Sequence, residues 1–102
     1  MDNSELSFTL NWTEVAVVWT TERFGEWPIG RIRLLPEISG SDKWEWTINL
    51  PLPIPPSCHG RTASLAEAQT AFRQAWEQFL PTIAESKLQH AFEVQRTAGR
   101  RV

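Results

Sequence analysis

The first half of the chain alternates between hydrophobic and polar residues, a pattern typical of strands with one buried face. Over residues 6–12 the hydrophobic side chains stand at even positions, and over residues 15–19 they stand at odd positions. A strand cannot change faces without an additional residue. We therefore expect either one strand with a bulge near residues 13–14 or two separate strands.

Two further segments alternate in the same way. Over residues 29–35, Ile32 and Leu34 stand opposite Arg31 and Arg33, and over residues 43–50 four hydrophobic residues alternate with polar ones. Residues 20–28 contain Gly25 and Pro28 and are predicted to form a turn or loop. Strands joined by short connections predict an antiparallel meander of three to four strands.

A proline-rich segment, residues 51–56, ends the strand pattern, because each proline removes a backbone donor that a sheet needs. Residues 58–61 are predicted to complete this loop. A helix then begins at Leu65, because Ser64 and Glu67 have the Ser-x-x-Glu spacing of a capping box.

The helix carries hydrophobic residues at three- and four-residue spacing, and Pro81 interrupts it. We expect a kink or a restart at Pro81, with the helical stripe continuing to about Val94. The predicted fold is α+β, with this C-terminal helix packed across one face of the meander. Residues 1–102 are expected to form one domain whose ends, residues 1–5 and 96–102, are frayed.

Composition limits location and partners. The chain has 102 residues, 41% of them hydrophobic, and a formal net charge of −2. The acidic N-terminus lacks the pattern of a signal peptide, and no apolar run approaches the ~20 residues of a membrane helix. With a single cysteine, Cys58, the sequence favours a cytoplasmic protein that does not engage a membrane.

No catalytic template is complete. Cys58 and His59 are neighbours, and neighbouring side chains on an extended loop point in opposite directions. Neither they nor His90 have the spacing of a metal site, and the phosphate-binding glycine motifs are absent from the sequence. We therefore predict no enzymatic activity, no cofactor and no metal.

Six tryptophans without a single tyrosine are the unusual feature of the composition. Trp44 and Trp46 fall on one strand face and are predicted to be core residues covered by the helix. The others on the N-terminal side have no evident burial partner, and one or more of them is expected to form an exposed patch. With two arginines that a core does not need, the candidate interaction surface comprises Trp12, Trp19, Trp27, Arg31 and Arg61.

From residue 29 onward the chain carries a series of short motifs in a fixed order. They are Ile-Gly-Arg-Ile at residues 29–32, Lys-Trp-Glu-Trp-Thr-Ile at 43–48, Gly-Arg at 60–61, Ser-Leu-Ala-Glu-Ala at 64–68 and Ala-Phe-Arg-Gln-Ala-Trp at 71–76. In this order and spacing the chain resembles a group of small uncharacterised proteins of rhizobial and related alphaproteobacteria. Arg33 stands where many members have tyrosine. The resemblance implies a bacterial, cytoplasmic, single-domain protein and brings no activity with it.

The motif positions that the resemblance marks include candidate core residues and the two arginines that a core does not need. They are Gly30, Arg31, Trp44, Trp46, Gly60, Arg61, Phe72 and Trp76.

The preferred hypothesis is a non-enzymatic protein-interaction module that binds an unknown protein partner or a second copy of itself. Residues 6–19 hold more aromatic and β-branched side chains than one short helix can cover. The alternative is nucleic-acid binding by the outer sheet face through Arg31, Arg33 and Lys43, as in the arm-binding domains of tyrosine integrases. Glu45 on the same face opposes it, and residues 1–50 carry a net charge of −4.

Overall fold

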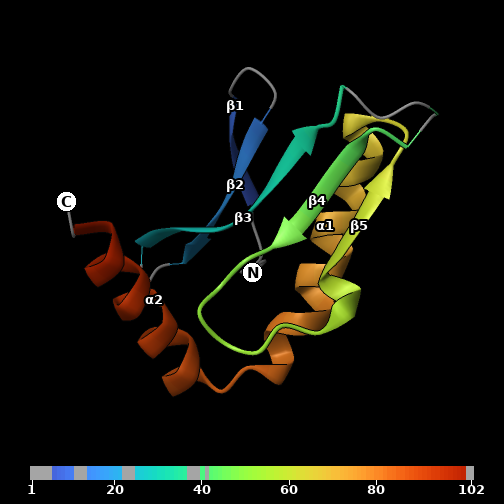
Figure 1. Cartoon of the computed structure of the whole chain (residues 1–102). Coiled ribbons are helices and arrows are strands. Elements are labelled where there is room, and N and C mark those ends of the chain that lie inside the picture. Colours follow the sequence, from blue (N-terminus) through green and yellow to red (C-terminus); the bar gives the residue numbers. More distant parts are fainter. Residues whose placement is uncertain (1–5, 11–13, 22–24, 37–39, 41, 101–102) are drawn as a thin grey trace.

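Five strands form one antiparallel sheet in the order in which they occur along the chain (Figure 1). The computed structural model describes residues 6–10, 14–21, 25–36, 40 and 42–100, with the backbone alone at residues 10, 14, 21 and 98–100. The strands are β1 (Leu6–Leu10), β2 (Glu14–Thr21), β3 (Gly25–Leu34), β4 (Trp44–Ile48) and β5 (His59–Thr62). The helices are α1 (Leu65–Phe79) and α2 (Glu85–Arg100). The α+β class is confirmed.

The number of strands differs from the three to four that the sequence predicts. Residues 6–19 form two strands, β1 and β2, which pair with each other. Residues 25–28, predicted as a loop, belong to β3 and pair with β2. Residues 59–61, also predicted as a loop, form β5 together with Thr62 and pair with β4. Both loop predictions are wrong, because cross-strand pairing keeps these glycine-containing segments in the sheet.

A register shift lies between β2 and β3, with the additional residue on β3. Val17 pairs with Gly30, and Val18 pairs with Pro28, so Ile29 has no partner on β2. One additional residue on one strand is the definition of a β-bulge. The bulge lets both Ile29 and Ile32 be fully buried although they are three residues apart.

One face of the sheet carries the core. On β2 the buried side chains are Val15, Val17 and Trp19, which share the odd positions of the alternation. Val15 is in register with the buried Ile32, which pairs with Trp46 of β4. Val17 is in register with Gly30, which pairs with the buried Ile48. On the opposite face, β3 and β4 carry mainly polar residues, whereas β2 carries Ala16, Val18 and Thr20.

Helix α1 begins as predicted. The backbone N–H of Glu67 donates to Ser64 Oγ (3.2 Å), and the Glu67 carboxylate accepts from the backbone N–H of Ala63 (3.2 Å). The buried positions of the helix are Ala68, Phe72, Trp76 and Phe79. Phe72 meets Trp46 edge-on, with ring centroids 6.1 Å apart. The prediction that the helix covers the tryptophan strand is confirmed.

The chain restarts its helix after Pro81, which is one of the two expected outcomes. A single 3-10 turn, Leu80–Thr82, follows α1, and α2 then runs to Arg100, beyond the predicted end near Val94. In Figure 1, β4 and β5 lie in front of α1, while α2 lies beside the far ends of β2 and β3. Neither helix, over the residues that the structure describes, is long and apolar enough to cross a membrane.

Candidate functional site

The five residues predicted to form an interaction surface are not brought together. Trp12 lies outside the described residues. Trp19 is 4% exposed and belongs to the core, so its prediction as a surface residue is wrong. Trp27 is half-buried on the core face, whereas Arg31 and Arg61 are exposed on the opposite face of the sheet.

Trp19 is buried between the two helices, because α2 folds back over the end of the sheet beside α1. Its ring lies 5.3 Å from that of Trp76 in an edge-on arrangement and 6.1 Å from that of Phe92. Phe92 also stacks on Trp27, with ring centroids 4.8 Å apart and planes 3° from parallel. The segment after Pro81 thus supplies the burial partner that the sequence left undetermined.

Helix α2 adds polar contacts that fix Trp27 in place. The Arg96 guanidinium lies over the Trp27 ring at 5.3 Å, within the range of a cation–π interaction. The Gln95 side-chain amide donates to the Pro28 carbonyl oxygen (2.9 Å). Trp27 is therefore a docking residue for α2.

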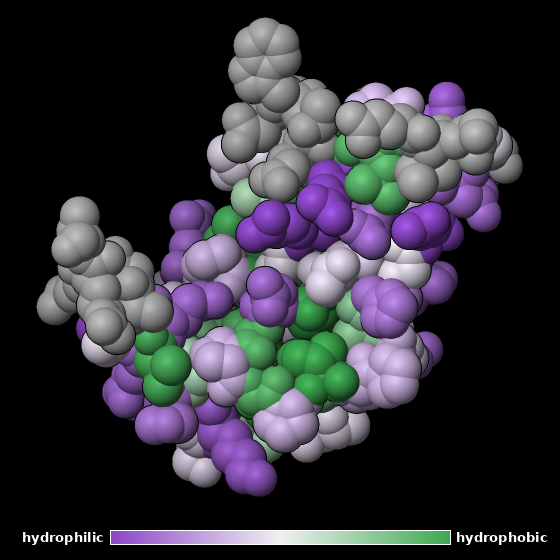
Figure 2. Space-filling view, viewed as in Figure 1, coloured by the Kyte–Doolittle hydropathy of each residue, from purple (hydrophilic) through white to green (hydrophobic). Residues whose placement is uncertain are grey.

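The outer face of the sheet brings charged residues of three strands into two rows. Arg31, Thr47 and His59 are in register across β3, β4 and β5. Arg33, Glu45 and Arg61 form the neighbouring row. Figure 2 shows this part of the surface as strongly hydrophilic.

Glu45, the acidic residue in the middle of the second row, forms an ion pair. Arg33 Nε donates to Glu45 Oε1 at 2.9 Å, in a pair whose side chains are 45% and 27% exposed. Arg61 stands opposite Glu45 on the other side. Strand β5 thus adds two residues, His59 and Arg61, to the face on which the sequence alone placed Arg31, Arg33 and Lys43.

Cys58 does not have the surroundings of a nucleophile. It ends the 3-10 turn Pro56–Cys58, its side chain is 1% exposed, and His59 beside it is exposed. Burial raises the pKa of the Cys58 thiol, and a hydrogen bond with Ser57 offsets only part of the rise. An activated cysteine needs a lowered pKa and access to substrate. Among the described residues no three His, Cys, Asp or Glu side chains are placed to hold a metal ion.

The burial of Cys58 predicts slow chemical labelling. In the native chain at neutral pH we expect the thiol to react at least ~100-fold more slowly than in the urea-unfolded chain, since it must first be exposed by opening that costs about 3 kcal/mol or more. Alkylation followed by mass spectrometry measures both rates. Equal rates would show that Cys58 is accessible in the folded protein.

One feature of the sheet face on which the helices pack was not predicted from the sequence. Phe8 of β1 is 37% exposed, although it shares the core face with the buried residues of β2. Helix α1 packs over β3, β4 and β5, and α2 packs over the ends of β2 and β3 through Phe92. The inner face of β1 therefore has no helix over it among the described elements.

A groove lies between β1 and α1. It has a volume of about 430 Å³ and is lined by Phe8 on one side and by Gln69, Thr70, Arg73, Gln74 and Glu77 on the other. Its walls thus combine one aromatic ring with amide, hydroxyl and charged groups. This mixture is suited to a polypeptide, which offers both side chains and backbone polar groups.

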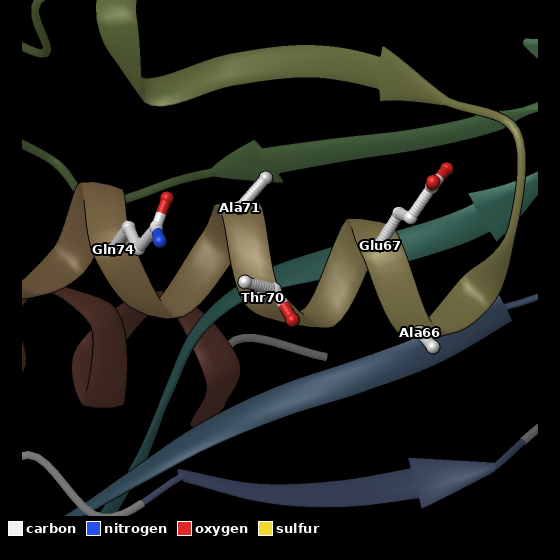
Figure 3. Close-up of a pocket in the computed structure, with 5 residues that line it drawn as sticks. All are labelled: Ala66, Glu67, Thr70, Ala71 and Gln74. Atoms are coloured by element: carbon white, nitrogen blue, oxygen red, sulfur yellow. The ribbon is translucent and has the colours of Figure 1, made fainter.

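A second, shallower hollow of about 320 Å³ adjoins the groove along α1. Figure 3 shows Ala66 and Thr70 on the side of the helix that faces β1 and β2, with Glu67 and Ala71 on the other side. The Glu67 carboxylate already accepts the Ala63 N–H of the helix cap. One polar group of the hollow thus already takes part in the helix cap.

A third hollow, of about 280 Å³, separates α2 from the segment after β4. Asn49, Leu50, Pro51, Val94 and Gln95 line it, and Val94 is 39% exposed. Figure 2 shows hydrophobic surface gathered in this region, below the hydrophilic part of the sheet. Phe8 and Val94 are the exposed large hydrophobic residues within the described part of the chain, and they belong to two different grooves.

The chain has no counterpart in the comparisons with known proteins: no family model, no curated protein and no solved structure matches it.

Proposed function

We propose that this chain is a non-enzymatic protein-interaction module that binds an extended polypeptide segment along β1. The observation that carries the proposal is the position of β1 at the edge of the sheet, with Phe8 exposed beside the groove. Addition of a strand to a sheet edge gives affinity through backbone hydrogen bonds and specificity through pockets for alternate side chains. We place this module in the cytoplasm, because a single cysteine is typical of a protein in a reducing compartment.

The two edges of the sheet differ in how open they are to an added strand. Edge strands of monomeric proteins are usually short or carry charged residues and prolines that prevent pairing. β5 has these features: it has four residues, includes Arg61, and follows the proline-rich segment. β1 has five residues, Leu-Ser-Phe-Thr-Leu, with no charge and no proline. The edge that lacks protection is therefore the one beside the groove.

The chemistry of the groove indicates which segment would bind. An added strand directs every second side chain to the helix face, where Phe8 offers an apolar contact. Gln69, Arg73 and Gln74 on the α1 side offer polar partners. We expect a segment that alternates between hydrophobic and polar residues, with at least one hydrogen-bonding side chain directed toward α1.

Selection from a random peptide library displayed on phage tests this proposal. Peptides selected on the full-length chain are expected to alternate in polarity and to shift the backbone amide resonances of residues 6–10 and of Arg73. Phe8→Glu is expected to weaken their binding at least ~10-fold, because it removes an apolar contact worth about 1.5–3 kcal/mol when fully buried.

Val94→Glu is the matched control, because Val94 has nearly the same exposed fraction as Phe8 (39% against 37%) and lines a different groove. It is expected to leave peptide binding unchanged. Peptides that map to the Val94 groove or to the outer sheet face, or a selection that yields no binder, would contradict the proposal.

The outer sheet face supports a second candidate, binding of double-stranded nucleic acid. The specific observation is that Arg61 and His59 of β5 lie in register with the rows that contain Arg31 and Arg33. The described aromatic rings of the sheet belong to the opposite face, so this face lacks the stacking platforms that single strands need. Phosphate contacts are therefore the form of binding that these residues support.

Arg31→Ala combined with Arg33→Ala tests this candidate. If the face binds DNA, the double variant is expected to weaken binding and to reduce the slope of log affinity against log salt by about 2, one for each lost phosphate contact. Fluorescence anisotropy of labelled duplex DNA measures both. Lys87→Ala, an exposed residue of α2, is the control. Absence of any complex at low salt would eliminate the candidate.

A further inference from the structure

We infer that the segment bound at β1 is β1 of a second copy of this chain. The inference rests on the proposed strand addition and names its partner. Two β1 strands would pair antiparallel, and the two sheets would join into one. Three features of β1 support a second copy over an unrelated segment: its sequence, the face that it exposes and its lack of edge protection.

The sequence of β1 is a chemical palindrome about Phe8. Antiparallel pairing with Phe8 opposite the partner's Phe8 places Leu6 opposite the partner's Leu10, and Ser7 opposite the partner's Thr9. Every pair then joins residues of one chemical class: aliphatic with aliphatic, hydroxyl with hydroxyl, and aromatic with aromatic. Such cross-strand pairs are the units that stabilise a sheet.

The exposed face of β1 is also self-complementary. A twofold axis makes an isologous contact, in which the same patch is used by both subunits. The two Phe8 side chains would lie on the same face of the joined sheet, with Cβ atoms about 4.5–5.5 Å apart. Each would cover part of the other's exposed surface, at the place where each chain has an uncovered strand beside its groove.

The polar side of β1 presents no obstacle to this pairing. Ser7 and Thr9 are exposed on the outer face, and neither is charged. None of the five residues of β1 is charged. Like charges therefore do not meet across the proposed axis.

Sedimentation equilibrium on paired charge variants tests this inference. The wild-type chain is expected to show a reversible monomer–dimer equilibrium with a dissociation constant of roughly micromolar order, because a short ladder buries less than a standard interface. Ser7→Lys with Thr9→Lys would place like charges opposite each other twice, and it is expected to weaken dimerisation about tenfold or more. Ser7→Lys with Thr9→Glu would place opposite charges there and is expected to dimerise at least as tightly as wild type.

Because the two double variants alter the same exposed positions, a difference between them reports on pairing and not on folding. Circular dichroism verifies that both variants are folded. A wild-type chain that stays monomeric at millimolar concentration, or two double variants with equal dimerisation, would overturn the inference. If the chain is monomeric but selected peptides still perturb residues 6–10, only the identity of the partner is wrong. If no peptide binds at β1 either, the proposed function fails as well.

Discussion

Replacement of Trp76 by alanine is expected to lower the free energy of unfolding by about 3–5 kcal/mol, the usual cost of removing a fully buried aromatic side chain. Trp76 is completely buried, and its ring packs between the sheet and the next turn of α1. Its ring is 5.3 Å from that of Trp19 and 6.3 Å from that of Phe79, edge-on in both cases. No described side chain or backbone group accepts a hydrogen bond from its indole N–H. The loss is therefore one of packing alone.

Urea unfolding followed by circular dichroism measures this effect, against a typical total stability of ~5–15 kcal/mol. Trp76→Phe is the informative companion, because it keeps an aromatic ring and removes the unpartnered N–H. We expect it to cost roughly 1–2 kcal/mol, less than half the alanine loss. A Trp76→Ala variant that unfolds at the wild-type urea concentration would show that this tryptophan does not hold α1 to the sheet.

Gly30→Ala is expected to be the second most damaging substitution, at about 1–3 kcal/mol or somewhat more. A Cβ atom at this position would collide with the backbone carbonyl oxygen of Thr47 and would lie 2.7 Å from two ring carbons of Phe72. Phe72 is fully buried, and the Thr47 carbonyl belongs to the β4 backbone, so neither can move away freely. Glycine is needed here because a helix side chain packs directly on the sheet backbone.

Gly60→Ala is the matched control for Gly30→Ala. Its Cβ would lie 2.9 Å from Trp46 Nε1, and its three nearest neighbours are all side-chain atoms of Trp46, with no backbone atom among them. Gly60→Ala is therefore expected to lower the free energy of unfolding less than Gly30→Ala does, although both glycines lie on core-facing positions next to an aromatic ring. Thermal or urea unfolding of the two variants ranks them, and an equal loss would contradict the distinction between backbone and side-chain neighbours.

Local sequence patterns predicted those parts of the fold that depend on neighbouring residues. The alternation of residues 15–19 identified the buried face of β2, and Ser64 with Glu67 located the start of α1. Pro81 marked the helix restart for a similarly local reason, since proline cannot occupy a helix interior without losing a hydrogen bond. Each of these features is decided within a few residues of the chain.

The features that the sequence did not predict depend on distant residues. Strand β5 contains no large hydrophobic residue, and its pairing is supported by the Trp46 ring that lies against Gly60. Trp19 is buried by Phe92, which is far along the chain and reaches the sheet only after the turn at Pro81. Neither contact leaves a periodic signal in the strand itself.

The candidate site was missed for the same reason. The pairing of β1 with β2 places Phe8 on the same face as Val17, and the alternation within each strand cannot tell which strands a helix will cross. Only the excess of hydrophobic residues over residues 6–19 indicated that some of them would remain uncovered. The structure places this excess at β1 and moves the candidate surface away from Trp19.

Disulfide trapping between variant chains tests the role of the β1 edge most directly. Ser7→Cys and Thr9→Cys chains, mixed in equal amounts under mild oxidation, are expected to form a cross-linked heterodimer, since directly opposed residues of antiparallel strands have the Cα separation that a disulfide needs. Each variant alone is expected to cross-link poorly, and the wild-type chain, with only the buried Cys58, not at all. Cross-linking that is equally efficient in the mixture and in the separate variants, or absent from all of them, would contradict association through β1.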